Sequence, residues 1–366
     1  MSMFHELMMR KKEQIMYATI KGTLTENNGV FSGFSASNYL ALQQSFTLTP
    51  TTKAEFVVRV SNTTFDGSSS FLGMIGSYSI NFRFNTGKKL VLYLGNGSSW
   101  VVNGLEGTTV FQENNFYYAK LVFDNGVITI YSSNSGKIWT QEATTTVSFT
   151  YTYNLIIGRA KNDSSYQKGS IDLNNSYIKL GSTKYKLQAV VGYKIVGSPT
   201  ITDGVVSGFV KNTNYLNINN MPFSSNVWEI VIRANHTSGN TTLIATNNDG
   251  RNGLLVLFGN KQITVYLKRD GADQTLITAS VEGLTDNNFH YMKLQRQYND
   301  LILSYSEDGI NYSVLNTVQP QSFIPNSNIC LGGGSYWSTV GFGGSIDMNE
   351  TLIKINNKLW FNGQEG

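Results

Sequence analysis

The chain has little charge, little proline and almost no cysteine. Only 14% of its 366 residues are charged, and it contains five prolines and one cysteine. A single cysteine cannot form an intrachain disulfide, so the fold does not depend on an oxidising compartment. The apolar residues on either side of Cys330 indicate a buried strand, in which we expect an inert thiol.

Long apolar runs and concentrated positive charge are missing too. The longest apolar run, residues 254–258, is far short of the roughly 20 residues that a membrane-spanning helix needs. The net charge of +4 is dispersed apart from residues 10–12, which argues against a nucleic-acid partner. Because residues 1–16 carry charges where a signal peptide would be apolar, we expect folding in the cytoplasm and no membrane insertion.

What the sequence does contain is a duplication. Gly-Val-Phe-Ser-Gly-Phe at 29–34 returns as Gly-Val-Val-Ser-Gly-Phe at 204–209. Asn-Asn-Phe, ending at Phe116, returns ending at Phe289, and Gly-Ser-Ile-Asp returns later in each copy. Three markers in the same order at nearly the same spacing indicate a duplicated domain.

Short apolar runs separated by turn residues predict β-strands. Residues 53–60 and 228–234 show partial alternation, and Asn-Gly at 125–126 joins two strand-like runs, a strong hairpin signal. Helical patterns are confined to the N-terminus. We therefore predict an all-β fold of two tandem antiparallel β-sandwiches, residues 17–188 and 189–366.

Residues 1–16 have a different character. Phe4, Leu7 and Met8 fall at helical spacing, with charged residues facing elsewhere, which predicts about two turns of amphipathic helix. A helix this short is marginal in water. We expect it either to fray or to dock on a partner subunit through these three apolar residues.

The order of the predicted elements resembles a known group of domains. An early Ser-Gly-Phe…Asn-Tyr-Leu strand, paired hairpins and a closing Gly-Ser-Ile-Asp strand are similar to laminin-G-like and concanavalin A-like lectin sandwiches of the jelly-roll type. The closing strand also resembles those of tail, fibre and head-decoration proteins of tailed bacteriophages. The resemblance implies a homo-oligomer on the virion surface that is made in the host cytoplasm. It also implies contacts to other virion proteins and to host-surface polysaccharide.

No catalytic set is recognisable in the sequence. Asp172 and Asp347 occupy equivalent places, but neither has an acidic neighbour in sequence, and a glycosidase needs two carboxylates across one sugar. The Glu-x-Asp-x-x-Glu strand of glycanases on this type of sandwich is not matched. We expect each aspartate to cap a turn or bond the backbone near the last strand, and we predict no catalytic residues and no enzymatic activity.

One hairpin turn resembles the Asp-box of sialidases. The sequence Ser-Ser-Asn-Ser-Gly-Lys-Ile-Trp ends at Trp139 and has Asn134 in place of the aspartate, and a second copy, one residue shorter, ends at Tyr312. We expect both turns to be structural. Gly136 and Gly309 would permit positive φ, and the two aromatic residues would pack the hairpins.

Two loops are candidates for ligand contact. Tyr166 in the first repeat, and Tyr336 and Trp337 in the second, lie on glycine-flanked loops at the predicted rim, where aromatic rings stack on sugars and Asp163 would bond hydroxyls. Alternatively, these loops pack on their own domain or on a neighbouring subunit. Asp163 and Asp249 are also candidate Ca²⁺ ligands, although Asn-Asp-Gly is ordinary turn chemistry.

The sequence therefore predicts a non-enzymatic phage virion protein, of tail or fibre type, that binds host glycan. Binding would be weak at each site and would gain avidity from many copies. The alternative is a structural decoration or connector protein that makes protein–protein contacts only, and an enzyme acting on capsular polysaccharide is the third hypothesis. Because the rim loops differ between the repeats, the duplication predicts a shared scaffold without a shared site.

Overall fold

The computed structural model describes residues 14–67, 69–160, 165–219, 221, 223, 226–237, 241–246, 252–259, 261–269, 272–285, 287–320, 328–333 and 341–365. The chain divides into two compact units, Met1–Ala189 (unit 1) and Val190–Gly366 (unit 2), and each is described by itself. Apart from one 3-10 helix, η1 (Glu282–Thr285), every element of these residues is a β-strand, which confirms the all-β prediction. Within the described residues, no helix is long and apolar enough to cross a membrane.

Unit 1 begins with a strand at Gln14, three residues before the expected Tyr17. Residues 1–13, including the predicted helix, lie outside the described part of the chain. The strands of unit 1 are β1 (Gln14–Lys21), β2 (Thr25–Asn27), β3 (Val30–Ser32), β4 (Tyr39–Leu42), β5 (Phe46–Leu48), β6 (Lys53–Asn62), β7 (Ser70–Gly73), β8 (Ile80–Phe84), β9 (Leu90–Gly95), β10 (Trp100–Glu106), β11 (Phe116–Asp124), β12 (Val127–Ser133), β13 (Thr140–Thr146), β14 (Tyr151–Tyr153), β15 (Ile156–Ile157), β16 (Arg159–Ala160), β17 (Ser165–Tyr166) and β18 (Gly169–Leu180).

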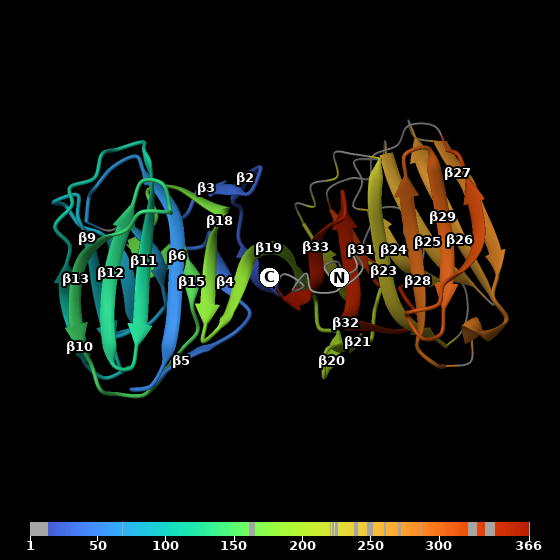
Figure 1. Cartoon of the computed structure of the whole chain (residues 1–366). Helices are drawn as coiled ribbons and strands as arrows, with labels where there is room; N and C mark the ends of the chain where they lie inside the picture. Colours follow the sequence, from blue (N-terminus) through green and yellow to red (C-terminus); the bar gives the residue numbers. More distant parts are fainter. Residues whose placement is uncertain are drawn as a thin grey trace, which may run out of the picture. The chain divides into compact units, whose positions relative to one another are not determined.

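Most of these strands form two antiparallel sheet layers, while β5 pairs with β14 and β16 with β17 in separate two-stranded sheets. In one, the pairing order is β2-β3-β18-β6-β11-β12-β13, and Figure 1 shows β6, β11, β12 and β13 side by side. In the other, the order is β1-β4-β15-β7-β8-β9-β10. The predicted hairpin between β11 and β12 is confirmed, because Asn125 and Gly126 both have positive φ and Asp124 pairs with Val127.

Unit 2 repeats this order. Its strands are β19 (Thr183–Val196), which crosses the boundary, β20 (Thr200–Thr202), β21 (Val205–Ser207), β22 (Tyr215–Ile218), β23 (Val227–His236), β24 (Thr241–Thr246), β25 (Asn252–Gly259), β26 (Gln262–Arg269), β27 (Ala272–Ser280), β28 (His290–Gln297), β29 (Asp300–Ser306), β30 (Ser313–Val318), β31 (Ile329–Leu331), β32 (Gly344–Ile355) and β33 (Lys358–Glu365). One layer is β20-β21-β32-β23-β28-β29-β30. The other is β19-β22-β31-β24-β25-β26-β27.

Aromatic rings fill the space between the layers of unit 1. Phe46 packs edge-on against Phe56 of β6 with ring centroids 4.9 Å apart, and Phe123 of β11 lies 5.5 Å from Phe46. All three are buried in a core that also takes Leu72 and Leu92 from the opposite layer. Each such side chain contributes on the order of 2–3 kcal/mol by leaving water, so this core is what presses the two layers together.

The cysteine of unit 2 is fully buried. Cys330 lies at the centre of β31, between β22 and β24, and its side chain is out of contact with solvent. Burial raises the pKa of its thiol to about 12. The predicted buried thiol is therefore confirmed, and the low thiolate fraction explains why it should be inert at neutral pH.

Candidate functional site

Of the predicted site residues, Tyr166 alone lies in the described part of the chain. The predicted glycan, calcium and docking residues outside it are Asp163, Tyr336, Trp337, Asp249, Phe4, Leu7 and Met8. Among the residues that are described, no group of three or more His, Cys, Asp or Glu could hold a metal ion. The calcium and docking assignments therefore stay predictions.

Tyr166 is in a short hairpin, where it pairs with Arg159 of β16. Its ring is half-buried, and the Lys168 ammonium lies 3.8 Å from the ring centroid. Burial alone would lower the pKa of Lys168, but a hydrogen bond with Tyr166 and the charge of Asp66 raise it. One face of the ring thus meets a cation, and its role in sugar stacking stays a prediction.

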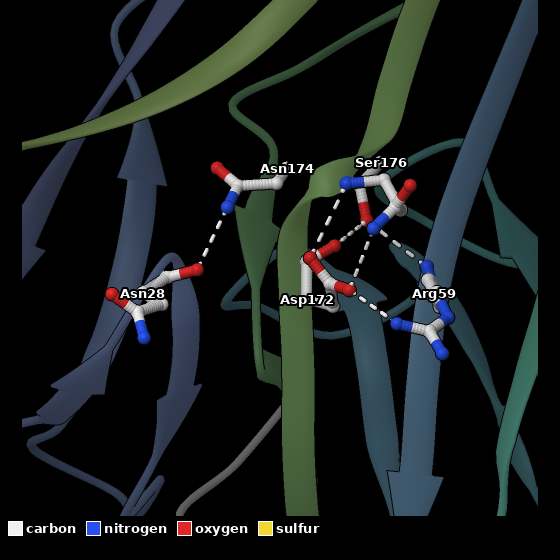
Figure 2. Close-up of polar contacts among 6 residues, drawn as sticks. Asn28, Arg59, Asp172, Asn174 and Ser176 are labelled. Atoms are coloured by element: carbon white, nitrogen blue, oxygen red, sulfur yellow. Dashed lines mark hydrogen bonds and ion pairs between the residues drawn. The ribbon is translucent and has the colours of Figure 1, made fainter.

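The aspartate of the repeated Gly-Ser-Ile-Asp marker makes a specific contact with the neighbouring strand. Asp172 on β18 accepts a hydrogen bond from Arg59 Nη1 on β6 (Figure 2). β18 pairs with β6 at Asp172 and again at Tyr177, opposite Val57, so β18 bulges between these pairs. Ser176 closes the bulge: its hydroxyl donates to the Asp172 carbonyl at 2.6 Å and accepts from the Arg59 amide at 2.9 Å.

A second side chain fixes the bulge to the hairpin between β2 and β3. Asn174 donates from Nδ2 to the carbonyl oxygen of Asn28 at 2.7 Å, as Figure 2 shows. Gly29 has a φ of +80°, and a Cβ there would lie 2.4 Å from Asn174 Nδ2. Glycine is needed at this point both for its backbone angle and for the close approach.

Unit 2 builds the same arrangement from its own residues. Arg233 Nη1 donates to Asp347 Oδ2 at 2.6 Å, Thr351 Oγ1 donates to the Asp347 carbonyl at 2.8 Å, and Asn349 reaches the Asp203 carbonyl at 2.8 Å. We call this set of contacts the Arg–Asp lock. The predicted backbone contact is confirmed in both units, because Asp172 and Asp347 each accept a bond from a backbone amide.

The arginine of each lock lies on an aromatic sheet face. In unit 1, Val58 and Val60 of β6 point into the core, so Arg59 between them points to the other face. There its guanidinium lies 4.5 Å from the ring centroid of Phe116 and 5.6 Å from that of Tyr118. In unit 2 the same relationships recur for Arg233, at 5.0 Å from Phe289 and 5.6 Å from Tyr291.

A lysine and a turn aromatic continue this face. Lys120 Nζ lies 4.0 Å from the Trp139 ring, and Lys293 Nζ lies 4.0 Å from the Tyr312 ring. Burial lowers the pKa of Lys120, an effect that the charge of Glu55 opposes. The duplication therefore extends to a surface of arginine, lysine and aromatic side chains, which the predicted scaffold-only repeat did not include.

Unit 1 has an open hollow of about 720 Å³ beside Arg59, which we call the Arg59 hollow. Its aromatic lining comes from Phe116 and Tyr117 at the start of β11. The remaining walls are Thr109, Val110, Gln112, Asn114, Asn115 and Asn134. The volume is within the range of small-molecule sites, although most of the lining residues carry polar or charged side chains, so the hollow is more polar than such sites usually are.

A buried carboxylate holds one wall of this hollow in place. Glu142 on β13 accepts hydrogen bonds from the backbone amides of Thr108 at 2.7 Å and Thr109 at 2.8 Å, and from the Ser132 hydroxyl. Burial would raise the pKa of Glu142, but these hydrogen bonds together lower it. We call this contact the Glu142 clip; it fixes the chain just before Val110.

The Asp-box prediction was right about the turn and wrong about the residue. Ser135 Oγ accepts from the Lys137 amide at 3.2 Å and lies 3.5 Å from that of Ile138, whereas Asp308 Oδ1 accepts from the Ile310 and Asn311 amides, both at 2.8 Å. Ser135, and not Asn134, therefore stands where unit 2 has the aspartate. These bonds lower the pKa of Asp308, first through the Asn311 amide.

The register also shows that neither copy of this turn is shorter. Tyr118 pairs with Ser133 as Tyr291 pairs with Ser306, and the turn aromatic follows six residues later in each unit. The predicted positive φ is confirmed for both glycines, at +71° for Gly136 and +73° for Gly309. Asn134 is free of the turn's hydrogen-bond pattern and lines the Arg59 hollow instead.

No family model matches the chain, and no curated protein matches its sequence. Similar solved structures include the mouse laminin alpha1 chain, domains LG4-5, at 13% identity, 98% coverage of this chain, 99% of that chain and a TM-score of 0.35. Carbohydrate binding module CBM66 from Bacillus subtilis has 10% identity and a TM-score of 0.30, and the match covers 43% of this chain and 92% of that chain. The alginate lyase from Corynebacterium sp. has 16% identity and a TM-score of 0.27, and the match covers 41% of this chain and 70% of that chain.

These neighbours are laminin G and other jelly-roll domains of the concanavalin A-like type, with an enzyme among them. Because their TM-scores are below 0.5, the fold class of this chain rests on its own strands and registers. The virion assignment remains a prediction from sequence resemblance.

Proposed function

We propose that the chain is a non-enzymatic carbohydrate-binding protein made of two tandem concanavalin A-like sandwiches, and that the Arg59 hollow is a binding site. The observation that carries this proposal is the lining of the hollow: a guanidinium and two aromatic side chains beside a set of neutral amides. Sugars offer apolar C–H faces and hydroxyl groups together, and this lining supplies a partner for each.

The amides suit hydroxyl recognition because each of them both donates and accepts. Gln112 and Asn115 are exposed, and their mutual contact is long, at 3.4 Å from Asn115 Nδ2 to Gln112 Oε1. Tyr117 packs against Phe111, with ring centroids 4.9 Å apart, and its hydroxyl accepts from the Gln112 amide at 3.2 Å. The backbone at Gln112 is therefore tied to β11, while the Gln112 and Asn115 side chains are exposed.

Binding without turnover is favoured because the nearby carboxylates are committed to structure. Asp172 is bonded to Arg59 and Asn175, and Glu142 is bonded to Ser132 and the loop before Val110. A glycosidase needs one carboxylic acid and one carboxylate free to meet the sugar. Neither of these two residues is in that state.

We further propose that the protein works on the surface of a tailed-phage virion, made in the host cytoplasm and attached through residues 1–13. The sequence resemblance to phage tail, fibre and head-decoration proteins supports this placement. Several copies on one particle would convert weak single-site binding into avidity for host-surface polysaccharide. Deleting residues 1–13 leaves β1 whole, so loss of particle incorporation would identify docking and not misfolding.

The binding proposal is tested on a glycan array with the purified protein and two variants, Gln112→Ala and Asn115→Ala. Each removes one exposed amide, and we expect roughly a tenfold loss of affinity, as for one or two hydrogen bonds. Asn288→Ala, at the place in unit 2 that matches Asn115, is the control. Tyr166→Ala tests the predicted rim loop separately.

The outcomes separate the hypotheses. Absence of binding to every glycan and to host cells would overturn the adhesin proposal and favour the structural alternative. Binding that only Tyr166→Ala weakens would move the site to the rim loop. Release of shortened glycan by the wild-type protein would overturn the non-enzymatic reading.

A further inference from the structure

The guanidinium of Arg59 has donors to spare. Within the part of the chain that the structure describes, its hydrogen bond is the one to Asp172. The side chain is 29% exposed and lines the hollow. The guanidinium carbon lies 4.5 Å from the Phe116 ring centroid, and Figure 2 shows one guanidinium nitrogen turned to Asp172 and the others turned away from it. Arg59 therefore presents a pre-oriented edge of N–H donors.

The negative charge of Asp172 is not offered to a ligand in the same way. Its side chain is only 5% exposed, and it is bonded to Arg59 and, at 2.9 Å, to Asn175 Nδ2. Asp172 is not among the residues that line the Arg59 hollow, and none of the lining residues is acidic. The exposed Glu113, between the lining residues Gln112 and Asn114, is paired with Lys88 at 3.4 Å, so a ligand in the hollow meets mainly hydrogen-bond donors and amides.

Unit 2 carries an acidic side chain at the place that matches Asn134. Glu307 follows Ser306 as Asn134 follows Ser133, in turns whose registers are equivalent. Both Asn134 and Glu307 are exposed. The two units thus share the Arg–Asp lock and the aromatic face, and differ in the charge beside them.

We infer that the Arg59 hollow selects sugars that carry a carboxylate, an inference that rests on the proposed glycan-binding function. The planar guanidinium edge is suited to a carboxylate, which it can bond through two parallel N–H···O contacts. The neutral amides then bond the hydroxyls of the same residue. Unit 2, which has Glu307 at the turn position of Asn134, should disfavour the same ligand.

The test compares three probes: an oligogalacturonate, the same oligosaccharide after reduction of its carboxyl groups, and a sialylated oligosaccharide. We expect at least a tenfold loss of affinity on carboxyl reduction, and weaker binding of the acid form as salt is raised. The uronate and the sialylated probe show which source of the carboxylate fits the hollow.

The decisive variant is Asn134→Glu, which places the acid of unit 2 in the exposed turn of unit 1. We expect roughly a tenfold loss for the acidic probe and a clearly smaller loss for any neutral glycan that binds, because the neutral glycan loses one amide contact but meets no charge repulsion. Glu307→Asn is the matched control: it removes the acid from the turn of unit 2 and should weaken binding of neither the acidic probe nor a neutral glycan. Arg59→Lys keeps the charge that pairs with Asp172 but loses the planar fork, and should also weaken the acidic probe.

Equal affinity for the acidic and the reduced oligosaccharide would overturn this inference and leave the glycan-binding proposal standing. Full binding of the acidic probe by Asn134→Glu would overturn it as well. If the protein binds none of the probes and no glycan on the array, the proposed function fails and this inference fails with it.

Discussion

Arg59 pairs with Asp172 across 113 residues of sequence, at the point where β18 leaves its register with β6. The same pair recurs in unit 2 between Arg233 and Asp347. In each unit a hydroxyl four residues after the aspartate, that of Ser176 or Thr351, donates to the aspartate carbonyl within the bulge, so the pair and the bulge form one structural device.

Asp172→Asn should destabilise unit 1 because it leaves the Arg59 charge without its buried partner. Breaking such a pair costs about 3 kcal/mol of unfolding free energy. Urea denaturation of the Asp172→Asn variant measures this loss. Asp124→Asn is the control, since Asp124 and its partner Lys53 have side chains 60% and 62% exposed, and an exposed pair contributes under about 1 kcal/mol. Equal losses in the two variants would contradict the lock.

Gly136→Ala should cost more stability than Gly181→Ala, although both glycines have positive φ. A Cβ at Gly136 would lie 2.9 Å from the Tyr118 ring, whereas at Gly181 nothing lies within 4 Å. Both variants incur the backbone cost of a non-glycine residue, about 1 kcal/mol, and only Gly136→Ala must also displace the ring. We expect the unfolding free energies of the two variants, measured by urea denaturation, to differ by about 1 kcal/mol. Equal values would mean that the Tyr118 ring moves aside at no cost.

Glu142→Gln should lose stability in a pH-dependent way. The pKa of Glu142 is lowered in the folded state, so the Glu142 clip contributes fully above the ordinary glutamate pKa and is lost as pH falls through the lowered value. We expect the variant to be about 1–2 kcal/mol less stable at pH 7, with the difference shrinking on acidification. Glu106 forms an exposed ion pair with Lys89. The Glu106→Gln variant should therefore lose less unfolding free energy, and its loss should depend less on pH.

Much of the scaffold could be predicted from sequence because turns and period-two alternation are local signals. The Asn125–Gly126 pair predicts its hairpin, and Gly136 and Gly309 predict their turns. The Asp-box register was missed because serine and aspartate both cap such a turn with a side-chain oxygen. The amino-acid sequence alone therefore suggested that Asn134 takes the place of the aspartate, whereas the hydrogen bonds show that Ser135 does.

The aromatic sheet face around Arg59 was missed for a different reason. Its signal was present, since Arg59 and Tyr118 occupy outward positions of two predicted strands and recur as Arg233 and Tyr291. Only the strand register places these residues opposite one another, however. Register is a long-range property, set by the fold and not by either strand alone. The aromatic residues were instead sought on loops, where sequence alone gives no partner.

Cys330 should report the opening of unit 2. With its thiol buried and its pKa raised to about 12, only about one molecule in ten thousand carries the thiolate at pH 8, even without the steric barrier. Labelling by a thiol reagent must therefore await unfolding of β31 from β22 and β24. We expect negligible labelling of the native protein over hours and complete labelling within minutes in urea. Native labelling at the rate of a free cysteine peptide would show that β31 is not held in the sheet.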